Sequence, residues 1–208
     1  MARVSGPLMS VDASGKFGGV MVFGKWKGRN YVRQLVTPMN PKSAKQTGVR
    51  AMMAFVSQIW YGLTAGNKLT WADLGTTKEI SAFNAFVSEA LSRWQMFKPP
   101  AKEFPAAESA NAITTTQACT PGQGFCTIVN TPSAAGDNWG VAIFRETAAI
   151  TVPNWNNCIA VIPADGANAV SYVDSPLEPD DYYYRSVFFN TDGTNGTICA
   201  DSDAKTVT

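Results

Sequence analysis

The stretch Tyr182-Tyr183-Tyr184-Arg185-Ser186-Val187-Phe188-Phe189-Asn190 is rich in aromatic residues and predicts a β-strand. It belongs to a series of short β-prone runs in the second half of the chain, separated by Gly, Pro, Asn and Asp. The strands are expected at residues 112–118, 124–130, 138–146, 156–162, 169–172, 182–190 and 197–201. This density of short strands favours a β-sandwich.

The first 40 residues predict an extended basic arm that leads into a β-hairpin. Residues 19–24 and 31–36 alternate like strands, and residues 25–30 supply the turn. Neither face of the second predicted strand is purely polar, which indicates a ribbon covered on both sides. Because a lone hairpin is marginal in water, we expect it to pack on the chain's own helices or on another chain.

Three helices are expected between the hairpin and the strands. The first spans about 44–61, with Ser43 and Gln46 in a capping-box pattern. A short helix follows, for which Thr70 is the expected N-cap. The third carries one apolar stripe, formed by Phe83, Phe86, Val87, Ala90, Leu91 and Trp94. The aromatic residues of these helices predict the core of a small helical bundle.

Charge divides the chain into two predicted domains. Residues 1–105 hold fourteen Lys and Arg against five Asp and Glu, whereas the remainder holds three against eleven. We therefore expect a basic arm, β-hairpin and helical docking domain at 1–97, a Pro-rich linker at 98–107, and an acidic β-sandwich domain at 108–208. The basic domain suits an acidic protein surface or nucleic acid.

Composition argues against an enzyme. The chain has no histidine, which removes the commonest general base and the commonest zinc ligand. No spacing of Asp or Glu marks a catalytic carboxylate pair, so we expect no enzymatic activity and no cofactor. The Asp/Asn/Gly loop at 190–196 lacks the Glu of an EF-type calcium site, and a hairpin turn explains it. No metal site is expected.

Contact with a membrane is not expected either. The chain has no run of eighteen apolar residues, and no apolar signal-peptide core follows Arg3. We therefore expect the chain to be made and used without crossing a membrane by itself.

Four cysteines, Cys119, Cys126, Cys158 and Cys199, lie in the acidic half at spacings that match neither a zinc nor a redox motif. One interpretation is buried thiols that pack as small hydrophobes. Another is a disulfide between Cys119 and Cys126, which flank a predicted turn and would face each other across a hairpin.

The predicted strand series resembles an immunoglobulin or fibronectin type III module. Such modules have a tyrosine near the start of the penultimate strand, and Tyr182 or Tyr184 would match it. Trp139 or Trp155 is the candidate core aromatic residue. The expected fold class is therefore α+β with two domains: an N-terminal β-hairpin plus small helical bundle, and a C-terminal all-β Ig/fibronectin III-like sandwich. The resemblance implies no activity.

The basic half resembles an uncharacterised protein family found in bacteriophages, prophages and Bacteroidetes genomes. Its members share a glycine-rich stretch, a Lys-Gly turn, a Val-Arg strand, a Pro-bounded loop and a helix that opens with Gln and Arg. The matching residues here are 14–23, 27–33, 38–41, 45–46 and 50, followed by 63–64, Trp71 and 81–87. The resemblance spans about residues 5–95 and implies the context of a phage structural gene product.

The leading hypothesis is a virion structural protein, made in the host cytoplasm, that forms a homo-oligomer in the particle. Its basic domain would dock on other proteins of the head, neck or tail, and its Ig-like domain would be displayed. The residues expected to carry docking lie at the hairpin turn and second strand: Lys25, Trp26, Lys27, Arg29 and Arg33. A solvated turn is the plain alternative.

Two other functions compete with docking. Nucleic-acid binding would use the same residues with Tyr31, Lys42 and Lys45, because basic and aromatic side chains alternate there. Recognition of a carbohydrate or cell surface would use the sandwich, through Trp155-Asn156-Asn157 and the loop at 190–196.

Overall fold

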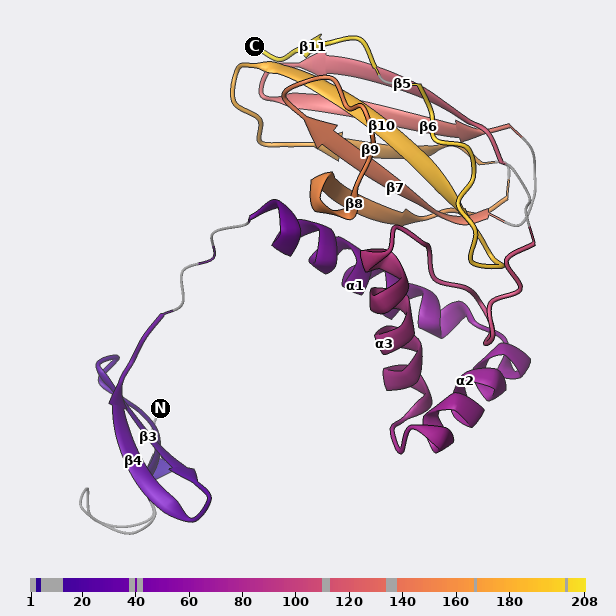
Figure 1. Ribbon diagram of the computed structural model, residues 1–208. Coiled ribbons are helices and arrows are strands. Elements are labelled where there is room, and N and C mark those ends of the chain that lie inside the picture. The colour runs from indigo at the N-terminus through magenta and orange to yellow at the C-terminus, as the bar shows by residue number, and fades with distance from the viewer. Residues whose placement is uncertain are drawn as a thin grey trace. The chain divides into compact units, whose positions relative to one another are not determined.

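The structure, a computed structural model, describes residues 3–4, 13–37, 40, 43–109, 113–133, 138–166, 168–200 and 202–208 (Figure 1). The chain divides into two compact units, residues 1–41 and residues 42–208. The fold is mixed α+β, and the paired strands of its three sheets run antiparallel.

The first unit is a sheet in the order β1-β2-β3-β4. Its strands are β1 (Arg3–Val4), β2 (Ala13–Phe17), β3 (Met21–Trp26) and β4 (Arg29–Gln34). Trp26 pairs with Arg29, so the hairpin turn consists of Lys27 and Gly28 alone. Both turn residues have positive φ, 48° and 79°, as the tight turns that match the twist of a hairpin require. The turn is thus shorter than the predicted one.

The second unit begins with three helices, α1 (Ala44–Gly62), α2 (Ala65–Thr77) and α3 (Ala82–Gln95), close to their predicted positions. Ser43 occupies the N-cap position of α1 as predicted, but its side chain makes no capping hydrogen bond. The predicted cap of α2 is wrong: Thr70 lies inside the helix, and Thr64 caps it by accepting a hydrogen bond from the Asn67 backbone N–H at 3.2 Å.

Two sheets follow, and they contact each other through a buried cluster. The first has the order β5-β6-β9, with β5 (Thr115–Gly122), β6 (Phe125–Pro132) and β9 (Val170–Asp174). The second has the order β11-β10-β7-β8, with β7 (Asn138–Glu146), β8 (Cys158–Pro163), β10 (Asp181–Asn190) and β11 (Lys205–Thr206). A 3-10 turn, η1 (Trp155–Asn157), precedes β8. Ile128, Ile143 and Tyr184 join the sheets in their shared apolar cluster.

The last strand is not where the sequence predicted it. Residues 197–200 form no strand, and β11 takes that place at the sheet edge. The segment before β11 still runs beside β10, since the Gly196, Cys199 and Ser202 backbone N–H groups each donate to a β10 carbonyl. The donors are three residues apart whereas their acceptors are two residues apart, so the segment does not form a regular antiparallel ladder.

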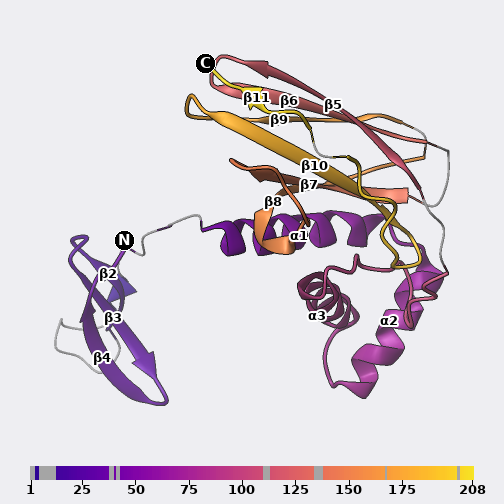
Figure 2. The same ribbon diagram turned by 45° about the horizontal axis from the view of Figure 1, so that its top comes forward.

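The β5 sheet packs on one face of the β7 sheet, and the helices cover the other face. The second unit therefore has three layers, formed by the β5 sheet, the β7 sheet and the helices (Figure 2). Phe55 of α1 lies 5.9 Å, between ring centroids, from both Trp139 of β7 and Phe189 of β10. Trp94 of α3 lies 5.7 Å from Phe189. The helices therefore share one core with the sheet and are not a separate bundle. This arrangement differs from the predicted division into a domain at 1–97 and another at 108–208.

The predicted linker is part of this packing. Buried Arg93 donates to the carbonyls of Pro99 and Gly193, at 2.9 Å and 2.7 Å, and to Glu108 at 3.0 Å. The Trp71 indole donates to the Lys102 carbonyl at 2.9 Å. Residues 98–108 are thus held against α2, α3 and the loop that follows β10, since the Lys102 and Glu108 backbone N–H groups also donate to the carbonyls of Thr191 and Asp192. Among the described residues, no helix is long and apolar enough to cross a membrane.

Candidate interaction surface

The hairpin presents its aromatic and basic side chains on one face. Residues directly opposite in an antiparallel pair point to the same side. The register pairs Trp26 with Arg29, Gly24 with Tyr31, and Val22 with Arg33. Trp26, Arg29 and Tyr31 together line a shallow hollow. Three of the predicted docking residues, Trp26, Arg29 and Arg33, therefore share a face, here called the docking face.

A glycine allows this aromatic arrangement. The ring of Tyr31 lies across Gly24, where a Cβ would come within 2.7 Å of the ring and of its hydroxyl. The Lys27 ammonium lies 4.8 Å from the centre of the Trp26 ring, a cation–π contact at the turn. Lys25 pairs with Asn30 and alternates to the other face, so the predicted set is split between the two faces.

Lys16 joins the docking face, although the sequence analysis missed it. It lies opposite Val22, which in turn lies opposite Arg33. Its strand, Ala-Ser-Gly-Lys-Phe, lacks the alternation that marks a strand, and only the pairing of β2 with β3 reveals its position. The docking face thus combines Lys16, Arg29 and Arg33 with two aromatic rings.

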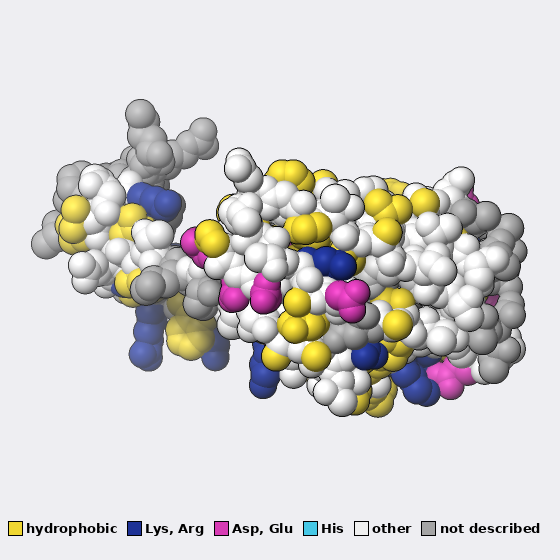
Figure 3. Space-filling model, turned by 90° about the horizontal axis from the view of Figure 1, so that it is seen from above, with side chains coloured by type: hydrophobic (Ala, Val, Ile, Leu, Met, Phe, Trp, Pro, Cys, Tyr) yellow, Lys and Arg dark blue, Asp and Glu magenta, His cyan; other side chains and the backbone are white. Residues whose placement is uncertain are grey.

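None of the placed side chains in this unit is buried. Trp26 is 67% exposed, Tyr31 43% and Val32 55%, and all of β4 is exposed. The sequence predicted a ribbon covered on both sides, yet no side chain within the described part of this unit forms such a cover. Basic and hydrophobic side chains lie next to one another on its surface (Figure 3). An exposed apolar and basic sheet of this kind is typical of a binding surface.

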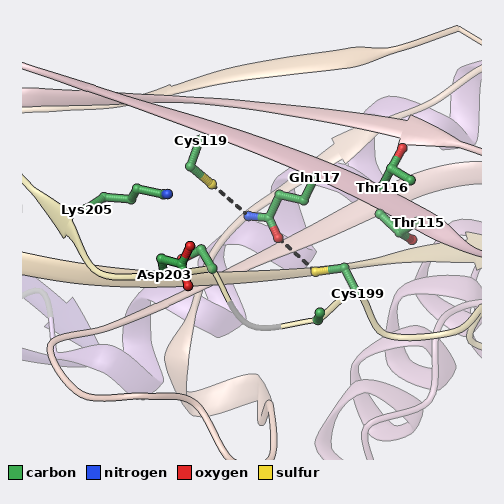
Figure 4. A pocket seen from close by; sticks show the side chains of 9 residues that line it. Thr115, Thr116, Gln117, Cys119, Cys199, Asp203 and Lys205 are labelled. Carbon is green, nitrogen blue, oxygen red and sulfur yellow. Dashed lines mark hydrogen bonds between the residues drawn. The ribbon is translucent and has the colours of Figure 1, made fainter.

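The second unit contains a polar pocket at the edge of its two sheets (Figure 4). Gln117 bridges two thiols there, since its amide donates to Cys119 at 3.2 Å and its carbonyl oxygen accepts from Cys199 at 2.7 Å. Burial raises the pKa of Cys119 to about 11, so this thiol stays protonated at neutral pH. Lys205 and Asp203 line the same pocket.

The predicted Cys119–Cys126 disulfide is not formed, and both thiols are free. The register places Cys119 opposite Ile128 and Cys126 opposite Pro121. The two cysteines are therefore diagonal neighbours rather than an opposite pair, a longer separation than a disulfide usually spans.

In the loop at 190–196, the candidate for carbohydrate or cell-surface recognition, the polar side chains form hydrogen bonds within the chain. Asp192 accepts from the backbone and hydroxyl of Thr194, at 2.9 Å and 2.7 Å, and from Ser109 at 3.0 Å. Asn195 donates to the Phe97 carbonyl at 2.7 Å. These bonds agree with a structured turn. Within the described residues, no group of three or more Cys, Asp or Glu could hold a metal ion.

Comparison with protein-family models, with curated proteins and with solved structures finds no significant match to the chain.

Proposed function

We propose that the chain is a multi-copy structural protein of a bacteriophage particle. In this proposal residues 1–41 dock on other virion proteins of the head, neck or tail, and residues 42–208 are displayed. One observation carries it: the first unit is a sheet with a basic and aromatic face, and none of its placed side chains is buried. Units of about 40 residues seldom stabilise themselves without disulfides, metals or a partner.

The charges of the two units support docking by the first. Residues 1–41 hold six Lys and Arg against one acidic residue, a formal charge of +5. Residues 42–208 hold eleven against fifteen, a formal charge of −4. A basic unit on an acidic body suits attachment to an acidic subunit surface, because complementary charge steers and orients association. The resemblance of residues 5–95 to a phage and prophage family supports the same context.

For the displayed unit we propose a fibronectin type III-like sandwich to which the helices are added. The orders β5-β6-β9 and β11-β10-β7-β8 would correspond to strands A-B-E and G-F-C-C′. The Tyr182 hydroxyl donates to the Glu178 carbonyl at 3.0 Å, at the start of β10. This is the geometry of the tyrosine corner that immunoglobulin-type folds place at the start of strand F.

Nucleic-acid binding is the second candidate. It is favoured by the placement of Trp26 and Tyr31 on the same face as Arg29 and Arg33, since aromatic rings among basic groups can stack bases. Binding of single-stranded DNA that weakens steeply with added salt would support this candidate.

Particle composition tests the structural role. Size-exclusion chromatography with light scattering measures the oligomeric state of the isolated chain, and quantitative mass spectrometry of purified phage particles measures copies per particle. We expect a fixed stoichiometry that matches a ring or shell of subunits. Absence from the particle, with a monomer in solution, would contradict the proposal and leave nucleic-acid binding as the better explanation.

A further inference from the structure

Strand β4 is an open edge of the first sheet. In the order β1-β2-β3-β4 it has one described neighbour, β3, and all six of its residues are exposed. An edge strand presents unpaired backbone groups that can pair with another chain. Unlike β1, which has two residues, β4 is long enough to support an added strand.

The register identifies the backbone groups of this edge. In a two-residue hairpin the residues flanking the turn form a hydrogen-bonded pair, here Trp26 and Arg29, and such pairs then alternate. The Leu35 backbone N–H donates to the Val20 carbonyl at 2.7 Å, in agreement with this alternation. The N–H and C=O groups of Val32 and Gln34 therefore point away from β3, toward the open edge.

The side chains of β4 define what an added strand must carry. Arg29, Tyr31 and Arg33 alternate onto the docking face. In a strand paired with β4, the residues opposite them would stand at i, i+2 and i+4. Carboxylates at i and i+4 would neutralise the two arginines, and an apolar residue between them would contact the tyrosine ring.

Building on the proposed docking function, we propose that β4 binds an extended segment of an acidic virion protein by strand addition, with carboxylates at i and i+4 opposite Arg29 and Arg33. Backbone hydrogen bonds at Val32 and Gln34 supply affinity, and the two arginines supply specificity, as in other edge-strand recognition. The partner thus has a sequence pattern rather than a general negative charge.

A second copy of this chain fits the edge less well. Antiparallel self-pairing centred on Tyr31 would place Arg29 opposite Arg33, and like charges in direct opposition are destabilising. Two units of formal charge +5 would also repel each other. Charged residues on an edge strand are a common means of preventing self-association.

Peptide binding to the full chain tests this proposal. The probe is a fluorescein-labelled peptide of about nine residues, a usual strand length, with two glutamates four residues apart among Thr and Val. One control peptide has lysines in place of the glutamates, and another has the same composition with adjacent glutamates. We expect fluorescence anisotropy to show that the chain binds the peptide with glutamates four residues apart more tightly than either control peptide.

Two substitutions separate backbone pairing from charge. Val32→Pro removes the outward N–H, and Val32→Thr is the matched control that keeps it. Val32→Pro loses one backbone hydrogen bond to the peptide and should bind it about tenfold more weakly. Val32→Thr loses none, so its affinity should change about twofold or less. The double variant Arg29→Glu/Arg33→Glu should reverse the preference, so that the lysine peptide binds better than the glutamate peptide. This gain cannot arise from misfolding.

Several results would overturn strand addition. The first is that the two glutamate peptides bind equally well, and the second is that Val32→Pro binds the peptide as tightly as the wild-type chain does. The third is that the chain binds oligothymidine but none of the peptides. The fourth is that the chain forms a dimer and that Val32→Pro dissociates it. If purified particles contain as many copies of the Val32→Pro variant as of the wild-type chain, strand addition is wrong. Docking through residues 1–41 would not be contradicted by that result. Absence of the wild-type chain from the particles would instead refute the docking function itself.

Discussion

Replacing Phe55 by alanine tests whether the helices and the β7 sheet share one core. The Phe55 side chain is fully buried on α1 and contacts Trp139 and Phe189 of the sheet. It also lies against Gly140, where an added Cβ would come within 2.5 Å of the ring. Deleting such a ring from a core usually costs about 3–5 kcal/mol of unfolding free energy. For a unit of this size the melting temperature should fall by about 6–20 °C.

The measurement must report on the helices and the sheets separately. Hydrogen exchange followed by mass spectrometry gives the protection of α3 and of β6, which does not contact Phe55 and belongs to the other sheet. With one core, both segments should lose the same free energy of protection. Tyr61→Ala on the same helix is the control, because this side chain is 86% exposed and should cost about 0.5 kcal/mol or less. Lost protection in the helices alone would refute the shared core.

Gly48→Ala should destabilise the chain by about 1–3 kcal/mol in chemical denaturation, because the added Cβ would collide with a backbone carbonyl of η1. Gly62→Ala is the control on the same helix: its Cβ would meet open space, so this substitution should not destabilise the chain. Hydrogen bonds from Lys98 and Arg93 hold the pKa of the Glu108 carboxyl below its usual range. The resulting stabilisation is present at neutral pH and is lost as the pH falls through the lowered pKa, so Glu108→Gln should flatten the decline in melting temperature between about pH 5 and 3. Removal of residues 1–41 should shift the melting temperature by about 2 °C or less, because the buried core lies in the second unit; a larger shift in scanning calorimetry would contradict this.

Local patterns in the sequence predicted most elements of the second unit. The apolar stripe that includes Phe86 and Trp94 predicts α3, and the run 138–146 predicts β7 with its observed ends. The start of α2 was missed because Thr64 and Thr70 are both acceptable caps, and hydrogen bonding at Thr64 distinguishes them only in the structure.

The shared core was harder to predict, because it depends on contacts between distant segments. A signal was nevertheless present. β7 is buried along almost its whole length, and its sequence, Asn-Trp-Gly-Val-Ala-Ile-Phe-Arg-Glu, has a nearly continuous apolar run. Such a run marks a strand covered on both faces, whereas a strand of an isolated sandwich alternates with polar residues. The charge boundary near residue 105 obscured this signal, because charge reports on surfaces and not on cores.

Residue types suggested Trp26, Arg29 and Arg33 as candidate docking residues, but they could not show which side chains share a face. The register of the hairpin determines that. With a turn of two residues, Lys25 lies on the face opposite the docking face. The pairing of β2 with β3 places Lys16 on the docking face. A shift of one residue in that register would exchange the two faces.

The most direct test of the proposed function compares purified particles from phage that encode the full chain with particles from phage that encode residues 42–208 alone. Quantitative mass spectrometry would count copies of each per particle, and circular dichroism would verify that the shortened chain is folded. The proposed docking predicts a fixed copy number for the full chain and none for the folded shortened chain. Equal copy numbers for the two would contradict it.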